Sequence, residues 1–263
     1  MLPLAAGKTP ATPAELAAAL TGGFAARGVT VGAMRAEGAA LDALLLLRVD
    51  ATGARFTRVF RLSASAVAGA PVVLVERLEI SGAPLDFEGT PLRIEVQAER
   101  AALGFAGPPE DGALVLVSAE TGSLLLGAAV ADLEALVQQL AAGAAEKQGV
   151  EIKRTKLEFT ARGPQALSFR CTVTAKMFVM SADLALSGEL AVDAQLNARV
   201  SGLTLGGDAM ITKIAGGFIR PQLEKLEGRV FPLGALSPGG LPLREVEIGT
   251  DGGLEIRAKF GRG

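Results

Sequence analysis

The residue types that enzymes use most often for acid–base chemistry are scarce in this sequence. Histidine is absent, which removes the commonest general base, a frequent metal ligand and the usual partner of a catalytic serine or cysteine. The one cysteine, Cys171, therefore has no histidine to activate it. Its place on the apolar side of a strand pattern predicts a small buried core residue. We expect no catalytic residues, no bound metal and no cofactor.

Two pairs of neighbouring acids are the other candidates for chemistry. Asp86 and Glu88 flank Phe87, and Glu110 adjoins Asp111. Acid pairs in loops are usually solvated surface groups, which is how we interpret these. The sequence carries no nucleophile elbow, phosphate loop, dinucleotide-binding turn or calcium loop. A carboxylate-only or Ser–Lys enzyme is the catalytic alternative that the residue types leave open.

The strongest signal is an apolar alternation between residues 167 and 200. Side chains with odd numbers from Leu167 to Ala175 point to one face, because successive strand residues alternate. After an apolar link at 177–180, the pattern returns from Leu186 to Val200, which predicts a strand of roughly 50 Å. We expect a long, strongly curved antiparallel sheet that surrounds something apolar.

Three amphipathic helices are expected to pack against this sheet. The first begins at Thr12-Pro13-Ala14-Glu15, which has capping-box spacing with proline at the first helical position. Its apolar stripe is Leu16, Leu20 and Phe24, and Gly28 ends it. The second spans 133–144, where apolar residues recur every three or four positions. The third runs from Asp208 to Leu226, with a kink before Pro221.

Short strands separated by glycine and proline turns fill the rest of the chain and predict antiparallel meanders. Leu44-Leu45-Leu46-Leu47 predicts a strand buried on both sides. Each helix precedes an antiparallel run, so the chain has two weakly similar halves, 12–122 and 123–263. The predicted fold is therefore α+β, a single domain over 1–263 in which a curved sheet wraps around helices.

Composition limits the partners and the location. Lys plus Arg number 26 against 28 Asp plus Glu, and these charges are scattered, so we expect no nucleic-acid partner. No apolar run reaches the roughly 18–20 residues that span a bilayer, and the first residues do not resemble a secretory signal. We expect a cytoplasmic protein as the sequence stands, or a periplasmic or envelope protein if a leader was removed. Transient membrane contact and homo-oligomerisation are further expectations.

A curved sheet with small inward residues leaves room for a hydrophobic ligand between sheet and helices. The inward positions of the two long strands and the apolar stripes of the second and third helices are the predicted lining. The candidate ligand-binding residues are Leu167, Phe169, Val173, Met177, Met180, Leu190, Val192, Leu196, Leu136, Leu140, Ile214 and Phe218. The rival interpretation is that these residues only pack against the helices.

The C-terminal region adds a resemblance to a known family. Phe231-Pro232-Leu233-Gly234, the segment Leu241–Ile248 and the Asp-Gly turn with its last strand, Thr250–Ile256, resemble the ending of the LmeA-like bacterial phospholipid-binding family. The order of helices and strands upstream is similar too, including the region 85–103. The resemblance implies a tubular lipid-binding (TULIP) fold that holds lipid between a curved sheet and a long helix. It implies no catalytic residues.

The functional hypothesis is non-catalytic binding or transport of a phospholipid or similar hydrophobic molecule. One alternative is a structural or assembly protein that pairs with another chain through long edge strands. The other alternative is a lipid-ester hydrolase that works without histidine.

Overall fold

The computed structural model describes residues 1–7, 9–56, 69–107, 112–145, 150–177, 180–207 and 223–262. Contacts within the chain define two compact units, and each is described by itself. Unit 1 contains Met1–Gly127, Gly234–Glu245 and Ile256–Gly263. Unit 2 contains Ala128–Leu233 and Val246–Glu255. The first break, after residue 127, lies close to the predicted boundary at 122, but the C-terminal segments return to unit 1.

The first helix of unit 1 forms as its sequence predicts. Helix α1 spans Pro13–Ala26, and the Thr12 hydroxyl accepts a hydrogen bond from the Glu15 amide at 3.2 Å. The Glu15 carboxylate in turn accepts the Ala11 amide at 2.7 Å, which completes a reciprocal cap. The predicted stripe, Leu16, Leu20 and Phe24, is buried. This stripe fixes which side of α1 faces the core.

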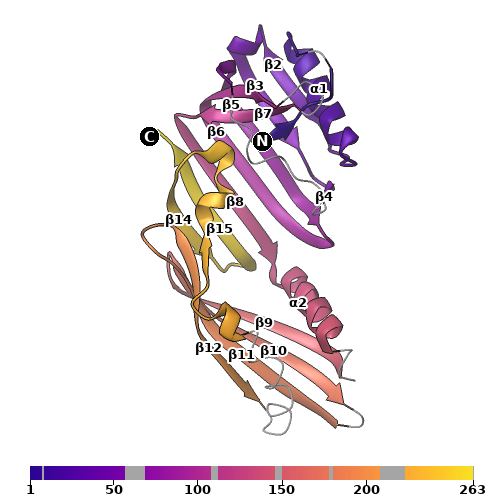
Figure 1. The fold of residues 1–263 in the computed structure, drawn as a ribbon, viewed down its shortest axis with the longest axis vertical. Helices are drawn as coiled ribbons and strands as arrows, with labels where there is room; N and C mark the ends of the chain where they lie inside the picture. The colour runs from indigo at the N-terminus through magenta and orange to yellow at the C-terminus, as the bar shows by residue number, and fades with distance from the viewer. Residues whose placement is uncertain are drawn as a thin grey trace. The chain divides into compact units, whose positions relative to one another are not determined.

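The larger sheet has the strand order β14-β15-β8-β6-β5-β3-β2, with β1, β4 and β7 paired off this path. Its strands are β1 (Leu2–Pro3), β2 (Met34–Gly38), β3 (Leu44–Asp50), β4 (Arg55–Phe56), β5 (Pro71–Phe87), β6 (Thr90–Ala106), β7 (Ala113–Ser118), β8 (Thr121–Ala129), β14 (Leu243–Gly249) and β15 (Gly253–Gly261) (Figure 1). Strands β3 and β4 pair with β5 in parallel. The sheet is therefore mixed, which corrects the wholly antiparallel prediction for this part of the chain.

The two longest strands are β5 and β6, at 17 residues each, and they form one hairpin. Glu88 and Gly89 turn the chain with positive φ angles of 53° and 84°. The Asp86 carboxylate accepts the Gly89 amide at 2.7 Å. One of the two acid pairs thus supports a hairpin turn.

Three adjacent strands change their buried face at the same level, which we call the face switch. The switch comprises the outward pairs Leu45–Leu46 in β3, Glu76–Arg77 in β5 and Glu99–Arg100 in β6. Buried residues on either side of each pair are three positions apart, and they align across the strands. Leu45 is 67% exposed, so the prediction that 44–47 is buried on both sides is wrong.

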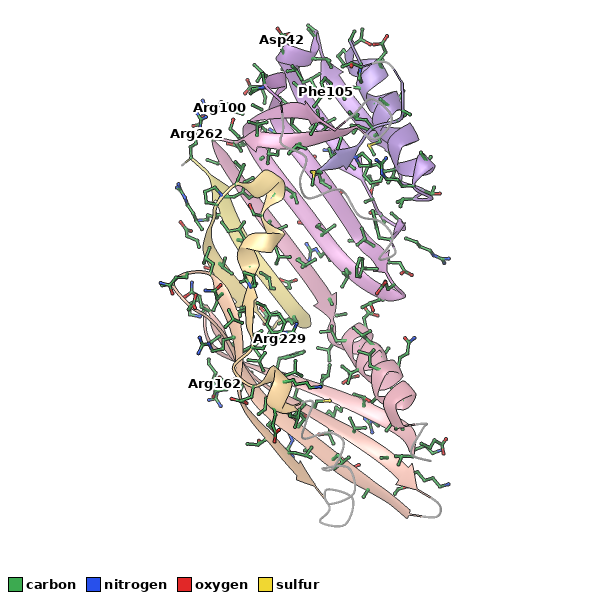
Figure 2. The ribbon with its side chains drawn as sticks, viewed as in Figure 1. Asp42, Arg100, Phe105, Arg162, Arg229 and Arg262 are labelled. Carbon is green, nitrogen blue, oxygen red and sulfur yellow. The ribbon has the colours of Figure 1, made fainter. Side chains whose placement is uncertain are left out.

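Strand β6 also changes its pairing partner at the face switch. Residues 93–99 pair with β8, whereas 102–106 pair with β7. Arg100, which is labelled in Figure 2, lies between the two stretches and has a positive φ of 45°. Its side chain forms an ion pair with Glu120. This arrangement brings β7 and β8 to successive lengths of one strand.

Unit 2 contains helix α2 (Val130–Ala145) and an antiparallel sheet with the order β13-β12-β11-β10-β9. Its strands are β9 (Glu151–Gly163), β10 (Ala166–Met177), β11 (Met180–Val192), β12 (Asn197–Gly207) and β13 (Val230–Pro232). Phe169 of β10 pairs with Phe159 on one side and Gly188 on the other. The predicted common face of β10 and β11 is thus confirmed.

The predicted strand from Leu186 to Val200 is wrong, because the chain turns between β11 and β12. The Asp193 carboxylate accepts the amides of Gln195 and Asn197, both at 2.9 Å, and Leu196 has a positive φ of 59°. The four turn residues keep the even-numbered apolar positions in phase, so the sequence pattern runs through the turn without a break. The third predicted helix lies mostly outside the described residues, which resume at 223 with a helical turn to 226.

Candidate functional site

An apolar pocket of about 550 Å³ lies inside unit 1. Helix α1, strands β1, β3 to β8 and the segment before β14 contribute its walls. Its lining residues are Met1, Leu2, Phe24, Val49, Ala51, Phe56, Leu78, Ile80, Leu85, Ile94, Val96, Leu103, Leu114, Val115, Leu116, Leu124, Gly234, Leu236, Ser237, Pro238, Gly239 and Gly240. The volume falls within the roughly 300–1,000 Å³ of small-molecule sites.

Neighbouring strands supply the wall through residues that pair across the sheet. Ile80 of β5 lies opposite Val96 of β6, and Val96 lies opposite Leu124 of β8. At the helical side, the rings of Phe24 and Phe56 meet edge to face with centroids 6.4 Å apart. The wall is therefore formed by hydrocarbon from several strands and by two aromatic rings.

One side of the pocket is formed by Gly234–Gly240, which we call the strap. It contains parts of two short 3-10 helices, η3 (Leu233–Leu236) and η4 (Pro238–Gly240), and appears in gold before β14 in Figure 1. Gly239 lies against β7 so closely that a Cβ there would be 1.9 Å from the Leu116 carbonyl oxygen. Glycine at 239 thus allows the strap to lie directly on the strand.

Polar side chains are rare among the described residues that line this pocket. Among the described lining residues no side chain is ionisable, and Ser237 alone carries a hydroxyl group. That hydroxyl donates a hydrogen bond to the Leu241 carbonyl oxygen, so it already has a partner within the strap. The pocket can hold apolar groups, and no lining side chain is placed to act as an acid, base or nucleophile on them.

The predicted ligand-binding residues that the structure describes lie in unit 2, and none of these described residues lines this pocket. Leu167 and Val192 are buried, and Phe169, Val173, Leu190 and Leu136 are half-buried. The side chains of Met177 and Met180, at the facing ends of β10 and β11, and all of Ile214 and Phe218 lie outside the described structure.

Two of the predicted residues lie in settings that differ from the expected buried helix stripe and strand. Leu140 of α2 is 65% exposed, although the period of its helix assigned it to the apolar stripe. Leu196 belongs to the turn after β11 and not to a strand. For the remainder the lining role stays a prediction.

The thiol of Cys171 is packed and not activated. Cys171 is buried in β10, as predicted, and burial followed by the negative charge of Glu134 raises the pKa of its thiol. The thiol therefore stays protonated at neutral pH. Thr155, also on this sheet, has a buried hydroxyl without a hydrogen-bond partner in the described structure.

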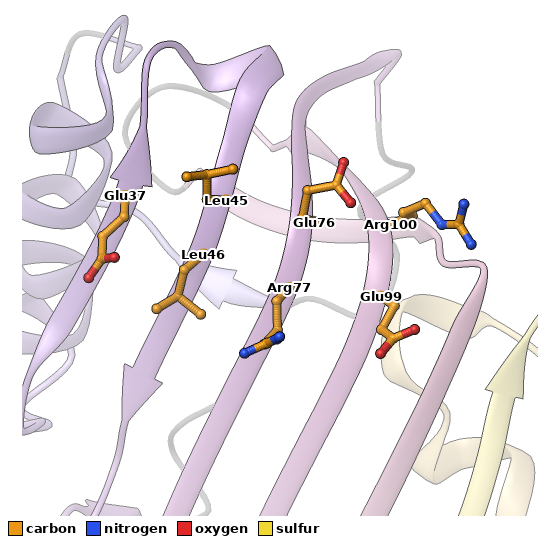
Figure 3. A pocket seen from close by; sticks show the side chains of 7 residues that line it. All are labelled: Glu37, Leu45, Leu46, Glu76, Arg77, Glu99 and Arg100. Atoms are coloured by element: carbon orange, nitrogen blue, oxygen red, sulfur yellow. The ribbon is translucent and has the colours of Figure 1, made fainter.

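A second pocket of about 550 Å³ follows from the face switch and opens on the outward side of the larger sheet. Figure 3 shows its lining side chains, which project from neighbouring strands: Glu37, Leu45, Leu46, Glu76, Arg77, Glu99 and Arg100. Acids and bases alternate across it, so their charges largely compensate. This pocket contrasts with the inner one, whose lining is hydrocarbon.

Carboxylates accept backbone amides of β9, an outer strand of the smaller sheet, and of the part of β12 that extends beyond its pairing with the short strand β13. Glu134 of α2 accepts the Leu157 amide of β9 at 2.8 Å. Glu227 accepts the amides of Gly202 and Leu203 of β12 at 2.9 and 2.8 Å. Amides engaged in this way are not available to an added strand.

Two other kinds of site, a metal centre and a membrane-spanning helix, are absent from the part of the chain that the structure describes. In the described ranges no group of three or more acidic or cysteine side chains is placed to hold a metal ion. No helix in those ranges is both long enough and apolar enough to cross a membrane.

No family model, curated protein or solved structure matches this chain. The LmeA-like resemblance and its lipid-binding fold therefore stay predictions.

Proposed function

We propose that this protein binds a hydrophobic molecule, such as a lipid, in the inner pocket of unit 1 without transforming it. The observation that carries the proposal is the set of side chains that line that pocket, which are apolar except for one hydroxyl already hydrogen-bonded in the strap. The binding hypothesis from the sequence is retained, but its site moves from β10 and β11 to the wall formed by β3, β5, β6, β7 and β8.

Burial of hydrocarbon would supply the affinity. Each methylene removed from water contributes about 0.8 kcal/mol, and a ligand that fills a preformed pocket orders few protein groups. Lining residues such as Leu78 and Leu114 are buried on rigid strands, which keeps the wall in place before the ligand arrives. The face switch also supports binding in this pocket. In β3, β5 and β6, the residues before the switch and the residues after it both place buried side chains on the inner side of the sheet. We infer that the sheet curves around the pocket.

The assembly alternative receives less support. Pairing with another chain needs free amides on a strand edge. In unit 2, Glu134 engages one amide of β9, and Glu227 engages two amides of β12 beyond its pairing with β13. The hydrolase alternative needs a nucleophile and a base beside the bound molecule, and the described lining side chains of the inner pocket supply no such pair.

The test is native mass spectrometry of the purified chain, before and after organic extraction. We expect a bound hydrophobic molecule in the untreated protein, or a one-to-one complex when delipidated protein is titrated with hexadecanol. Protein that carries nothing and takes up no hexadecanol would contradict the proposal, and would show that the inner pocket only separates core residues.

A further inference from the structure

The inner pocket has a size that limits which hydrophobic molecules it can hold. A water molecule occupies about 30 Å³ of the liquid, and a methylene group is of similar size. A volume of about 550 Å³ therefore has room for roughly 18 such groups. That is one long hydrocarbon chain. A second chain of equal length would have to remain outside.

The charge of the lining limits the position of the polar end. Moving an ionised or strongly polar group from water into hydrocarbon is unfavourable unless a partner awaits it. Among the described lining residues only Ser237 has a polar side chain, and its hydroxyl proton is committed to the Leu241 carbonyl oxygen. Burial also lowers the pKa of the Met1 amino group, because the lining disfavours the charged form of this amine. A polar head group is therefore more stable in water than inside the pocket.

The exposure of the lining shows where such a head group would leave. Three lining residues are exposed to solvent, namely Gly234, Leu236 and Gly240, and all three belong to the strap. The other described lining residues are buried or half-buried. Leu236 is 37% exposed while it also contacts the pocket, so the mouth lies beside this side chain.

We propose that the inner pocket takes one unbranched hydrocarbon chain, tail first, and leaves the polar end of that molecule in water beside the strap. This inference rests on the proposed function and specifies its ligand class, a single-chain amphiphile. The recognised chemistry is the chain itself. Fatty alcohols, fatty acids and lysolipids share this chemistry, whereas two-chain phospholipids would hold only one of their chains inside.

Titration calorimetry with straight-chain alcohols of 8 to 22 carbons tests the ligand class. We expect affinity to rise about fourfold per added methylene and to stop rising near 18 carbons, because further methylenes stay in water. Hexadecyl phosphocholine should bind within a few-fold of hexadecanol, since both heads lie outside. This inference would be overturned if affinity still rises at 22 carbons, or if each chain of a dipalmitoyl lipid contributes as much affinity as the single chain of hexadecanol. The binding function would stand in either case. An absence of binding at every length would instead contradict the function.

Charge placed at the mouth tests the orientation. We expect Leu236→Glu to weaken hexadecyl phosphate and strengthen hexadecyl trimethylammonium, each by about two- to fivefold, and Leu236→Lys to reverse both changes. Leu140→Glu is the matched control, since Leu140 is also exposed but lies in unit 2. Equal effects on both amphiphiles, or equal effects of the control, would overturn the tail-first orientation. The folded state of each variant is checked by its circular dichroism spectrum.

Discussion

The two units contain apolar sheet faces that are built differently. In unit 1 the strands skip one inward position at the face switch, and the inner side encloses a hydrocarbon-lined pocket. In unit 2 β10 and β11 keep a regular alternation, and α2 contacts β9 beside them. Regular alternation marks a half-buried face, but it does not by itself produce an interior space. The interruption of the alternation accompanies the pocket.

The polar groups near each face sharpen this difference. The inner pocket of unit 1 has one hydroxyl group among its described lining residues. In unit 2, the Glu134 carboxylate accepts the Leu157 amide, and the pKa of the Cys171 thiol is raised first by burial and then by the negative charge of Glu134. A carboxylate beside a sheet face makes that face a poorer environment for hydrocarbon. The comparison therefore favours unit 1 as the ligand-binding unit.

The largest expected difference concerns stability. Leu114 is fully buried in the pocket wall, so we expect Leu114→Ala to lower the free energy of unfolding by about 2–5 kcal/mol. The same change at Leu140, on the exposed side of α2, should cost no more than about 0.5 kcal/mol. Urea unfolding of both variants measures this. Similar costs would mean that Leu140 is covered in solution and that unit 2 has the deeper core.

The next test fills each face with a larger side chain. Ile94→Trp places an indole ring in the inner pocket, and we expect hexadecanol affinity to fall about tenfold or more, because the ring displaces several methylenes of the ligand. Leu190→Trp makes a matched change at a half-buried strand position of unit 2 and should leave affinity unchanged. Calorimetry distinguishes the units. Loss of binding only in the Leu190 variant would return the site to the face predicted from the sequence.

A smaller effect is expected on the rate of ligand exchange. Gly239 and Gly240 both have positive φ angles, 63° and 78°, but a Cβ meets the Leu116 backbone at Gly239 and nothing within 4 Å at Gly240. Gly239→Ala should therefore lift the strap from β7 and speed hexadecanol dissociation by about tenfold. Stopped-flow measurements on Gly240→Ala control for backbone strain, which both variants share. Equal dissociation rates in the two variants would contradict the idea that the ligand leaves past the strap.

The smallest expected effect is the loss of stability at acidic pH, which we expect in both units. Asp50 in unit 1 and Asp193 in unit 2 both have a lowered pKa, chiefly because each carboxylate accepts a backbone amide, from Thr52 and Asn197 respectively. Because the folded pKa is below the unfolded value of about 3.9, each turn contributes stability above that value and loses it as the pH falls through the folded pKa. Carboxyl NMR titration checks this in each unit. A raised pKa at either aspartate would contradict it.

Local features were predictable because short-range physics determines them. The cap of α1 depends on Thr12 and Glu15, three residues apart, and both the helix and its buried stripe formed as expected. The Asp-Gly turn at 250–252 joins two final strands, also as expected. The end of β11 was missed because its four-residue turn preserves the parity of the apolar positions. Asp193 and Asn197, which are typical turn residues, were the signal that could have revealed it.

The pocket was not predictable in the same way. Its wall combines short stretches from near position 1 to position 240, and these stretches are far apart in the sequence. Leu44 and Leu47 are buried three positions apart, which in a run of four leucines looks the same as a strand buried on both sides. The partner strands settle this, since β5 and β6 skip a position at the same level. Only the pairing register, which the sequence does not contain, reveals the face switch.

The glutamates that accept strand amides in unit 2 bear on how the protein behaves at high concentration. Each of Glu134 and Glu227 supplies an acceptor where an added strand would otherwise bind. One substitution at either position frees the amides concerned. Protection against edge-to-edge pairing is thus provided in part by two side chains that do not line the pocket.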